Sequence, residues 1–409
     1  GSWREAAALH QAAASAAHEL QDRSGEADAL LSLSRAYEAA GDYPSADAQC
    51  ELALAIYTEL GDVLGEANAV HTHGRVLLMS NDLPAAAARQ ERALSLYRTL
   101  GDSLGEANAL CQLGRLAMFT SDAAASADLA SMALSIYRQL GDRLGEADTR
   151  WDLARARQLA GDTSDGPDLV AGALVIYQEL GYRSGEAKAL CALARFSDEA
   201  GDHVGAAGLI ERALAIYREI GSPLGEAAAC RELAQARLMT GDLERASGLL
   251  EHALGLFRAI GGRLGQADSL HDLGRTRLAQ ADYPAAAGLL REALDLFREL
   301  GVSLGEAEVL VSTGELLAQT AGAEAAADVY RRAASLAREI DARPLEAEAL
   351  EGTARCQAAS GDVPAAITAL REAVAIYRRT GSAKADEASA LLDALQERDP
   401  HLAYPRLDN

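Results

Sequence analysis

Two short patterns in the sequence contain residue types that hydrolysis or metal binding would need. The pattern G-x-S-x-G, which presents a serine nucleophile in many hydrolases, occurs at residues 101–105 and 301–305. That role requires a strand before the turn, and both segments follow a helical pattern instead. His71 and His73 are the closest pair of histidines, but a spacing of two places them on different faces of a helix. We therefore expect no catalytic residue and no metal ligand.

Motifs for bound cofactors are also missing from the sequence. It contains no G-x-x-x-x-G-K-[ST] loop, no H-E-x-x-H and no C-x-x-C, so no cofactor is expected. The acidic segment 162–168 does not have the spacing of an EF-hand loop, and it indicates a late-starting helix rather than a calcium site.

Composition excludes several further classes of protein. The chain has 409 residues, of which 49% are hydrophobic and 4% aromatic, and its formal net charge is −23. A surface this acidic repels phosphate backbones, which argues against direct nucleic-acid binding. No apolar run is long enough to span a bilayer, so we expect no signal peptide and no membrane association. The five scattered cysteines indicate reduced, buried thiols in a cytoplasmic protein.

A 40-residue period organises the chain. The tetrapeptide Leu-Gly-Glu-Ala or a close variant begins at residues 24, 64, 104, 144, 184, 224, 264 and 304, and a degenerate copy begins at Pro344. Each period contains two segments with helical spacing of apolar residues, and no alternating strand pattern. Gly41 supplies a left-handed helix stop and Asp42 a helix N-cap. A fixed period of this length predicts an all-α solenoid of about ten helix-turn-helix repeats.

The small and large residues of each period resemble the tetratricopeptide repeat. In the first repeat the signature places hold Leu30, Leu33, Ser34, Tyr37, Ala46, Cys50 and Ala53. The six additional residues per repeat make it similar to the long repeats of kinesin light chains, and to those that follow the nucleotide-binding domain in actinobacterial NB-ARC and SARP-type regulators. The resemblance implies a right-handed superhelix whose first helices line a concave groove, and it implies protein binding rather than catalysis.

We expect one solenoid over residues 1–397. Residues 1–20 match the second helix of a truncated repeat, residues 24–380 form nine full repeats, residues 384–396 form a capping helix, and residues 398–409 form a tail. Because the truncated repeat at residues 1–20 lacks its first helix, we expect the chain to be the C-terminal part of a larger bacterial regulatory protein.

The resemblance places one position of each first helix in the groove, and arginine dominates this position. Seven of nine repeats have arginine there, namely Arg35, Arg75, Arg115, Arg155, Arg195, Arg275 and Arg355, while Gln235 and Glu315 hold the other two places. Five of these arginines have an acid three or four residues away in their own helix, which would satisfy them structurally. Arg75 and Arg115 have none, and are expected to be unpaired.

Repeats two to four are therefore the predicted partner site. Arginine suits carboxylates, and amide side chains can hold an extended backbone. Large apolar groups and methionine are typical of partner surfaces. The predicted ligand-binding residues are Asn68, Arg75, Met79, Asn108, Arg115, Met118, Phe119, Trp151 and Arg155.

Two functions remain open. The first is an interaction module that binds an acidic peptide or helix of another protein, or of missing N-terminal domains of its own chain. The second is a sensory domain that binds a small molecule and relays the signal to an upstream nucleotide-binding or DNA-binding domain. A peptide site should be long and open, whereas a small-molecule site should be a closed pocket of a few hundred Å³.

One ring in most second helices has an expected structural role. Tyr57, Tyr97, Tyr137, Tyr177, Tyr217, Phe257, Phe297 and Tyr377 recur every 40 residues, one turn before a helix end. We expect each ring to pack against the first helix of the next repeat. Ala337 interrupts the series, so we expect looser stacking after it.

Overall fold

The computed structural model describes residues 2–162 and 164–398, and these ranges contain twenty α-helices and no strand. Two compact units, residues 1–196 and 197–409, divide within α10 and are described separately. The predicted tail beyond residue 398 lies outside the described residues. The first unit contains α1 (Ser2–Glu19), α2 (Arg23–Ala40), α3 (Tyr43–Leu60), α4 (Val63–Met79), α5 (Leu83–Leu100), α6 (Ser103–Phe119), α7 (Ala123–Leu140), α8 (Arg143–Leu159), α9 (Gly166–Glu179) and most of α10 (Arg183–Glu199).

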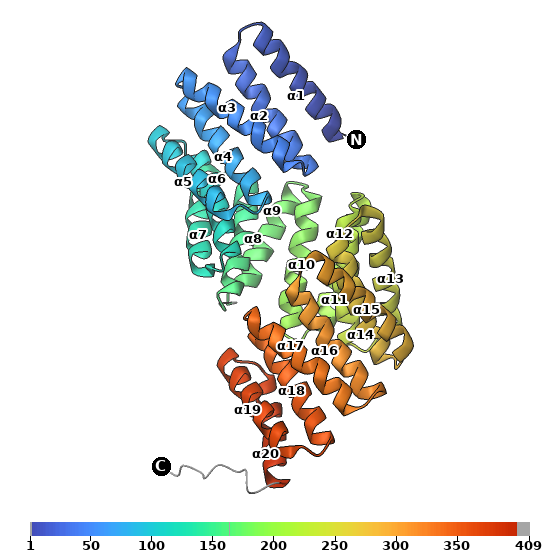
Figure 1. The fold of residues 1–409 in the computed structure, drawn as a ribbon. Helices are drawn as coiled ribbons and strands as arrows, with labels where there is room; N and C mark the ends of the chain where they lie inside the picture. Colours follow the sequence, from blue (N-terminus) through green and yellow to red (C-terminus); the bar gives the residue numbers. More distant parts are fainter. Residues whose placement is uncertain (1, 163, 399–409) are drawn as a thin grey trace, which may run out of the picture. The chain divides into compact units, whose positions relative to one another are not determined.

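The second unit continues the same pattern of helices. It contains α11 (His203–Glu219), α12 (Pro223–Met239), α13 (Leu243–Ile260), α14 (Arg263–Ala279), α15 (Tyr283–Leu300), α16 (Ser303–Thr320), α17 (Ala323–Glu339), α18 (Arg343–Ala359), α19 (Val363–Thr380) and α20 (Lys384–Arg398). The first helices of the repeats, from α2 to α18, begin 40 residues apart, which confirms one helical pair per period. Within each unit, helices that follow one another along the chain pack side by side in series (Figure 1). The protein is therefore an all-α helical repeat solenoid.

The predicted caps define the helix ends. Gly41 ends α2 in the left-handed conformation with φ 76°, and the side chain of Asp42 accepts a hydrogen bond from the backbone of Ser45 at 3.2 Å. Glycine adopts this backbone conformation without a steric penalty, and the carboxylate satisfies a free N–H of the first turn. The same pairing of stop and cap recurs in most repeats, and it fixes the period.

The fourth repeat departs from this pattern. Its second helix, α9, begins at Gly166, as the acidic segment predicts, and Pro167 lies in the first turn. Asp165 makes no capping hydrogen bond, and its carboxylate pairs with Arg157 instead. A Cβ at residue 166 would overlap the ring of Phe196, so glycine at this position lets the first helix of the next repeat approach closely.

The aromatic series is structural, as predicted. All eight rings are at most 8% exposed. A Cβ added to Gly65 or Gly145, each in the first turn of the following repeat, would overlap the ring of Tyr57 or Tyr137. The rings therefore lie directly against the start of the next repeat, where glycine leaves room for them.

The expected loosening at Ala337 is wrong. Ala337 is fully buried, and α17 packs against α18 as other neighbouring helices do. Tyr330, two turns earlier in α17, fills the space and is 6% exposed. A Cβ at Gly314 or Gly352 would overlap its ring, so one tyrosine packs against the first helices of two successive repeats.

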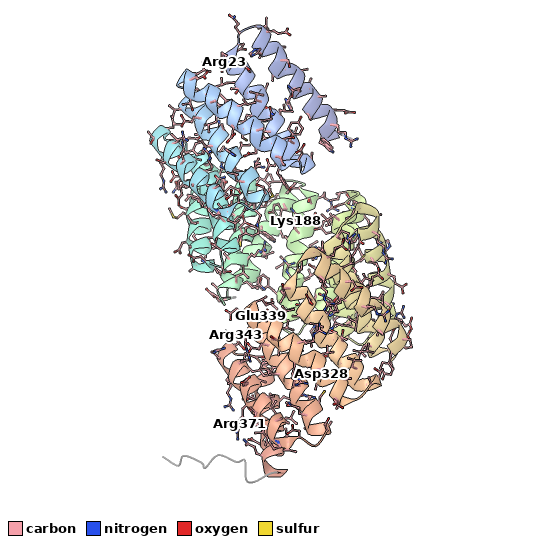
Figure 2. The ribbon with its side chains drawn as sticks, viewed as in Figure 1. Arg23, Lys188, Asp328, Glu339, Arg343 and Arg371 are labelled. Atoms are coloured by element: carbon pink, nitrogen blue, oxygen red, sulfur yellow. The ribbon has the colours of Figure 1, made fainter. Side chains whose placement is uncertain are left out.

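Charged side chains project outward along the helices, as Arg23 and Arg343 do in Figure 2. Many of them form pairs, such as Arg23 with Glu26 at 2.6 Å and Arg343 with Glu346 at 3.1 Å. All five cysteines are free thiols, four of them buried. None of the described helices is long and apolar enough to cross a membrane.

Candidate ligand-binding site

Four predicted residues line one cavity of about 470 Å³ in the first unit: Asn68, Arg75, Asn108 and Arg115. The cavity lies along α2, α4, α6 and α8, which are the first helices of repeats one to four. It therefore brings together residues separated by up to 47 positions in the sequence. Arg35, which the sequence placed in the groove, also lines it. So do further side chains that were not among the predicted ligand-binding residues: His71, Tyr97, Cys111, Gln112, Tyr137, Asp148 and Thr149.

The expectation that Arg75 and Arg115 are unpaired is wrong. Nη2 of Arg75 donates to Oε1 of Glu38 at 2.7 Å, and Nε of Arg115 donates to Oδ2 of Asp152 at 3.0 Å. Both acids belong to a neighbouring repeat, 37 residues away along the chain. Burial raises the pKa of Asp152, although the attraction of Arg115 opposes this shift. Each arginine retains guanidinium N–H groups that these bonds do not use.

Because Glu38 and Asp152 pair with arginines of other repeats, two further arginines lack the acids expected to pair with them. Glu38 and Asp152 are the acids expected to satisfy Arg35 and Arg155 within their own helices. Among the described residues, Arg35 has no hydrogen bond or ion pair, and Arg155 stacks on the ring of Trp151 at 5.7 Å without an ion pair. Of the five predicted in-helix pairs, that of Arg355 with Glu351, at 2.6 Å, is present. Arg35 is therefore the free cation of the cavity.

Hydrogen bonds from tyrosines orient the two asparagines. Tyr97 donates its hydroxyl proton to Oδ1 of Asn68 at 2.8 Å, and Tyr137 donates to Oδ1 of Asn108 at 2.7 Å. The amide oxygens are therefore occupied, and the amide NH₂ groups remain as donors. A ligand that meets these side chains should accept hydrogen bonds.

The same bond involves aspartate in the flanking repeats. Tyr57 donates to Asp28 at 2.5 Å, and Tyr177 donates to Asp148 at 2.6 Å. Repeats two and three thus keep the geometry of this bond but lack its negative charge. Because repeats two and three have asparagine where the flanking repeats have aspartate, the electrostatic potential is more positive where Arg75 and Arg115 lie.

His71 adds a neutral group to the cavity. Burial lowers the pKa of His71 to about 4, and the charges of Arg75 and Arg35 act in the same direction. Its Nδ1 lies 2.9 Å from Oε1 of Gln90, which cannot donate, so the ring donates through Nδ1. The ring is therefore uncharged at neutral pH, and its Nε2 is an acceptor.

The aspartates of the cavity are already engaged. Asp102 and Asp142 accept backbone hydrogen bonds from Gly105 and Gly145 at 3.1 and 3.0 Å, and Asp148 accepts from Tyr177. Each carboxylate is therefore partly satisfied by the protein, while Arg35 is not. The unsatisfied donors of the cavity favour an anionic ligand group.

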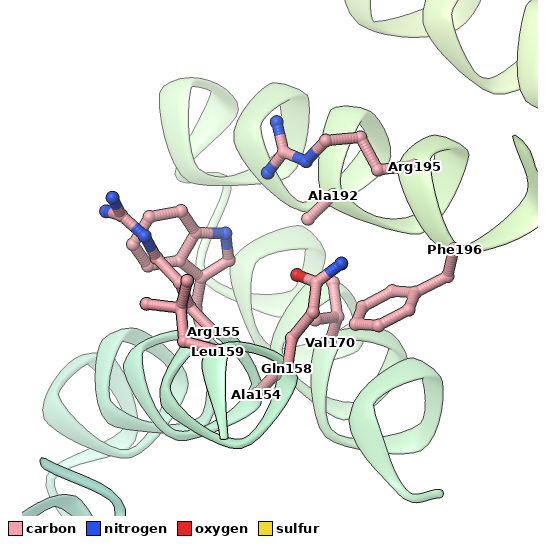
Figure 3. Close-up of a pocket in the computed structure, with 9 residues that line it drawn as sticks. Ala154, Arg155, Gln158, Leu159, Val170, Ala192, Arg195 and Phe196 are labelled. Atoms are coloured by element: carbon pink, nitrogen blue, oxygen red, sulfur yellow. The ribbon is translucent and has the colours of Figure 1, made fainter. Parts of the chain in front are cut away.

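Two further predicted residues, Trp151 and Arg155, lie in a second cavity of about 370 Å³. Figure 3 shows Arg155, Gln158 and Leu159 along α8, and Arg195 and Phe196 on the helix opposite. Val170 of α9 lies between the two helices. This cavity combines an apolar floor with arginine side chains at its sides.

The remaining three predicted residues line neither cavity. Met79 and Phe119 are 48% and 61% exposed, and Met118 is half-buried, all in the last turns of α4 and α6. They are exposed apolar surface near the ends of the helices that carry Arg75 and Arg115.

The second unit has a cavity of opposite charge. It has a volume of about 330 Å³ and is lined by Arg231, Arg275, Asp268, Asp272, Glu308, Glu315 and Glu348, among others. Burial and the neighbouring carboxylates raise the pKa of Glu308. Acids outnumber arginines here, so an anionic ligand should prefer the first unit.

The geometry described above is that of a repeat scaffold, and comparison with known proteins identifies the repeat. Residues 27–99 and 226–299 match the tetratricopeptide repeat family. These two segments of the chain therefore consist of tetratricopeptide repeats. None of the curated protein sequences matches it.

Solved structures with the same fold include a Rap protein, a quorum sensor and a STAND protein. A Rap protein complexed with competence and sporulation factor aligns with a TM-score of 0.62 and 15% identity, covering 91% of this chain and 99% of the other. The apo form of the quorum sensor NprR from B. thuringiensis aligns with a TM-score of 0.59 and 13% identity, covering 93% and 99%. A STAND protein with a tetratricopeptide repeat sensor from Pyrococcus horikoshii aligns with a TM-score of 0.59 and 14% identity, covering 85% and 55%. At these identities the likeness concerns the fold.

Proposed function

We propose that the first unit is a binding module for an acidic peptide, which it holds along α2, α4, α6 and α8. The anionic group of the peptide lies against Arg35, Arg75 and Arg115, and the amides of Asn68 and Asn108 donate to its backbone. The observation that carries this proposal is the free guanidinium of Arg35 beside two arginines whose forks are only partly used.

The composition of the cavity supports a polar, extended ligand rather than an apolar one. Arginine, asparagine, glutamine, histidine, aspartate and threonine contribute most of its lining. The exposed Met79 and Phe119 offer apolar contacts next to it, which an anchor side chain of a longer peptide would cover. Proteins of the same fold include a Rap protein in complex with competence and sporulation factor, which accords with a regulatory interaction. The partner is another protein, or a segment of a longer parent chain.

A selection experiment tests this proposal directly. Random 15-residue peptides displayed on phage are selected on the immobilised full chain, and the Kd of each enriched peptide is measured by fluorescence anisotropy. We expect enrichment of Asp, Glu or a free C-terminal carboxylate together with one large apolar residue.

Arg35→Gln then identifies the site. A charge-assisted hydrogen bond contributes about 1.5–3 kcal/mol, so this variant should weaken binding at least about tenfold. Arg245→Gln is the matched control, because this arginine is 71% exposed and lies on α13 of the second unit. Enrichment of neutral or basic peptides, or equal affinity of Arg35→Gln and the unmodified protein, would contradict the proposal.

The second cavity supports the sensory alternative. Its volume of about 370 Å³ falls within the range of small-molecule sites, and Trp151 and Phe196 provide aromatic surface. The chain has two tryptophans, so Trp3→Phe leaves Trp151 as the single fluorophore. A screen of aromatic carboxylates by Trp151 fluorescence in that variant tests this function. A saturable response that Arg155→Gln abolishes would favour it, and the absence of any saturable response would eliminate it.

A further inference from the structure

A buried histidine meets two acids of the preceding repeat, away from the proposed peptide site. Nε2 of His73 in α4 lies 2.5 Å from Oδ1 of Asp47 in α3. Glu51 lies one turn after Asp47, and one ligand atom from each of the three side chains falls within 4.8 Å of the others. His71 lies two residues earlier, which is about 200° around the axis of α4. It lines the cavity of about 470 Å³ instead.

Comparison between the repeats shows that this cluster replaces apolar packing. The positions equivalent to His73 hold Leu33, Leu113, Leu153, Leu193, Leu233, Leu273, Thr313 and Thr353. The positions equivalent to Asp47 hold Ala87, Ala127, Pro167, Ala207, Ser247, Ala287, Ala327 and Ile367. A histidine and an acid therefore depart from the repeat pattern at the same contact. Burying the imidazole and partly desolvating the carboxylate cost free energy, which leucine and alanine at these positions would not.

The imidazole has the properties of an available ligand. The side chain of His73 is 3% exposed, and its Nδ1 is buried without a hydrogen-bond partner among the described residues. No second hydrogen bond fixes the tautomer, so the ring can carry its proton on Nδ1 while Nε2 binds a cation. Asp47, at 41% side-chain exposure, and the exposed Glu51 give an ion a path from solvent.

Other histidine–carboxylate pairs in the described residues lack these features. His18 pairs with Glu26, His203 with Asp198 and His252 with Glu226, with histidine side chains 70%, 27% and 48% exposed. Within the described part of the chain, the cluster of Asp47, Glu51 and His73 alone brings a third ligand atom into range.

We propose that Asp47, Glu51 and His73 form a binding site for a divalent transition-metal ion of the Zn²⁺ type, which links the first repeat to the second. One imidazole nitrogen and two carboxylates are ligands that Zn²⁺ accepts, and water would complete the coordination shell. Because the ligands come from α3 and α4, the ion would hold the two helices together and stabilise the folded state by mass action.

The experiment uses the metal-free full chain and Zn²⁺ as the probe, followed by isothermal titration calorimetry and thermal unfolding. We expect one ion per chain to bind more tightly than any other, and the melting temperature to rise with Zn²⁺. Glu51→Gln, at an exposed position that should not affect folding, should weaken this binding at least about tenfold.

A second variant restores the pattern of the other repeats. The double change Asp47→Ala with His73→Leu should fold, since these residues occupy the equivalent places elsewhere, and it should lose the tight site. His252→Gln, which removes an exposed pair, should retain it. Absence of saturable Zn²⁺ binding by the unmodified protein, or binding that persists in the double variant, would overturn the proposal.

Discussion

Glu38 accepts a hydrogen bond from Arg75 of the next repeat at 2.7 Å, although Arg35 lies three residues before Glu38 in the same helix. The equivalent exchange occurs where Asp152 pairs with Arg115 rather than with Arg155. These two ion pairs therefore join successive repeats, and they leave Arg35 and Arg155 without the acid expected to pair with each in its own helix.

Arg75 and Arg35 should differ in their effect on stability. The side chain of Glu38 is 13% exposed, so Arg75→Ala leaves a poorly hydrated carboxylate without its partner. We expect a loss of about 1–3 kcal/mol, whereas Arg35→Ala should change stability by less than about 0.5 kcal/mol. Urea unfolding followed by circular dichroism measures both values. Equal losses would show that Glu38 does not distinguish between the two arginines.

Two glycines should respond oppositely to alanine. A Cβ at Gly145 would overlap the buried ring of Tyr137, so Gly145→Ala should destabilise the protein by about 1–3 kcal/mol. Gly248, inside α13, has open space around it, and Gly248→Ala should stabilise the protein by up to about 1 kcal/mol through helix propensity. Thermal unfolding compares them, and a neutral Gly145→Ala would mean that the ring does not press on α8.

Removal of the Tyr137 ring should be more severe. The side chain is 4% exposed and its hydroxyl bonds to Asn108, so Tyr137→Ala removes both packing and a hydrogen bond. The expected loss is about 3 kcal/mol. A loss below about 0.5 kcal/mol in urea unfolding is incompatible with a buried ring.

The stability should fall below neutral pH in part because of His71. Its pKa is about 4 in the folded protein and about 6.5 when unfolded, so the unfolded chain binds more protons between these values. The contribution of this group is complete above about pH 6.5 and decreases as the pH falls toward 4. From pH 7 to 5.5, the unmodified protein should lose about 1 kcal/mol more than His71→Gln, measured by urea unfolding. Parallel curves for the two proteins would exclude the effect.

The thiols should be unreactive in the folded protein. Burial raises the pKa of both Cys50 and Cys230 to about 11, so only about a thousandth of each is thiolate at pH 8. Ellman's reagent should label these cysteines slowly before denaturation and rapidly after it. Fast labelling of Cys50 or Cys230 in the folded protein would contradict this prediction. If the folded Cys50→Ala variant is labelled as fast as the unmodified protein, another thiol is reacting, and mass spectrometry identifies it.

The repeat architecture was predictable because each repeat carries its own signals. The 40-residue period, the glycine stops, the aspartate caps and the tyrosine series all depend on local sequence, and the structure confirms them. The partners of the arginines were missed because the pairs join residues 37 positions apart, as Glu38 and Arg75 do. The spacing of 37 residues, three fewer than one repeat, can be seen in the sequence. Only the stacking of successive repeats shows that residues at this spacing are in contact. The role of Tyr330 was missed for a similar reason. Its ring fills the space that a ring at position 337 would occupy, and only the packing between helices shows this.

Introducing negative charge at positions 68 and 108 provides the most direct test of the proposed anion site. Replacing both with Asp keeps the tyrosine hydrogen bond, as Asp28 and Asp148 show in the adjacent repeats, and adds two negative charges. We measure the Kd of the selected acidic peptide for this double variant and for Asp148→Asn. We expect the double variant to bind at least about tenfold more weakly, Asp148→Asn to bind more tightly, and both to keep their helical content. Unchanged affinity in Asn68→Asp with Asn108→Asp would contradict it.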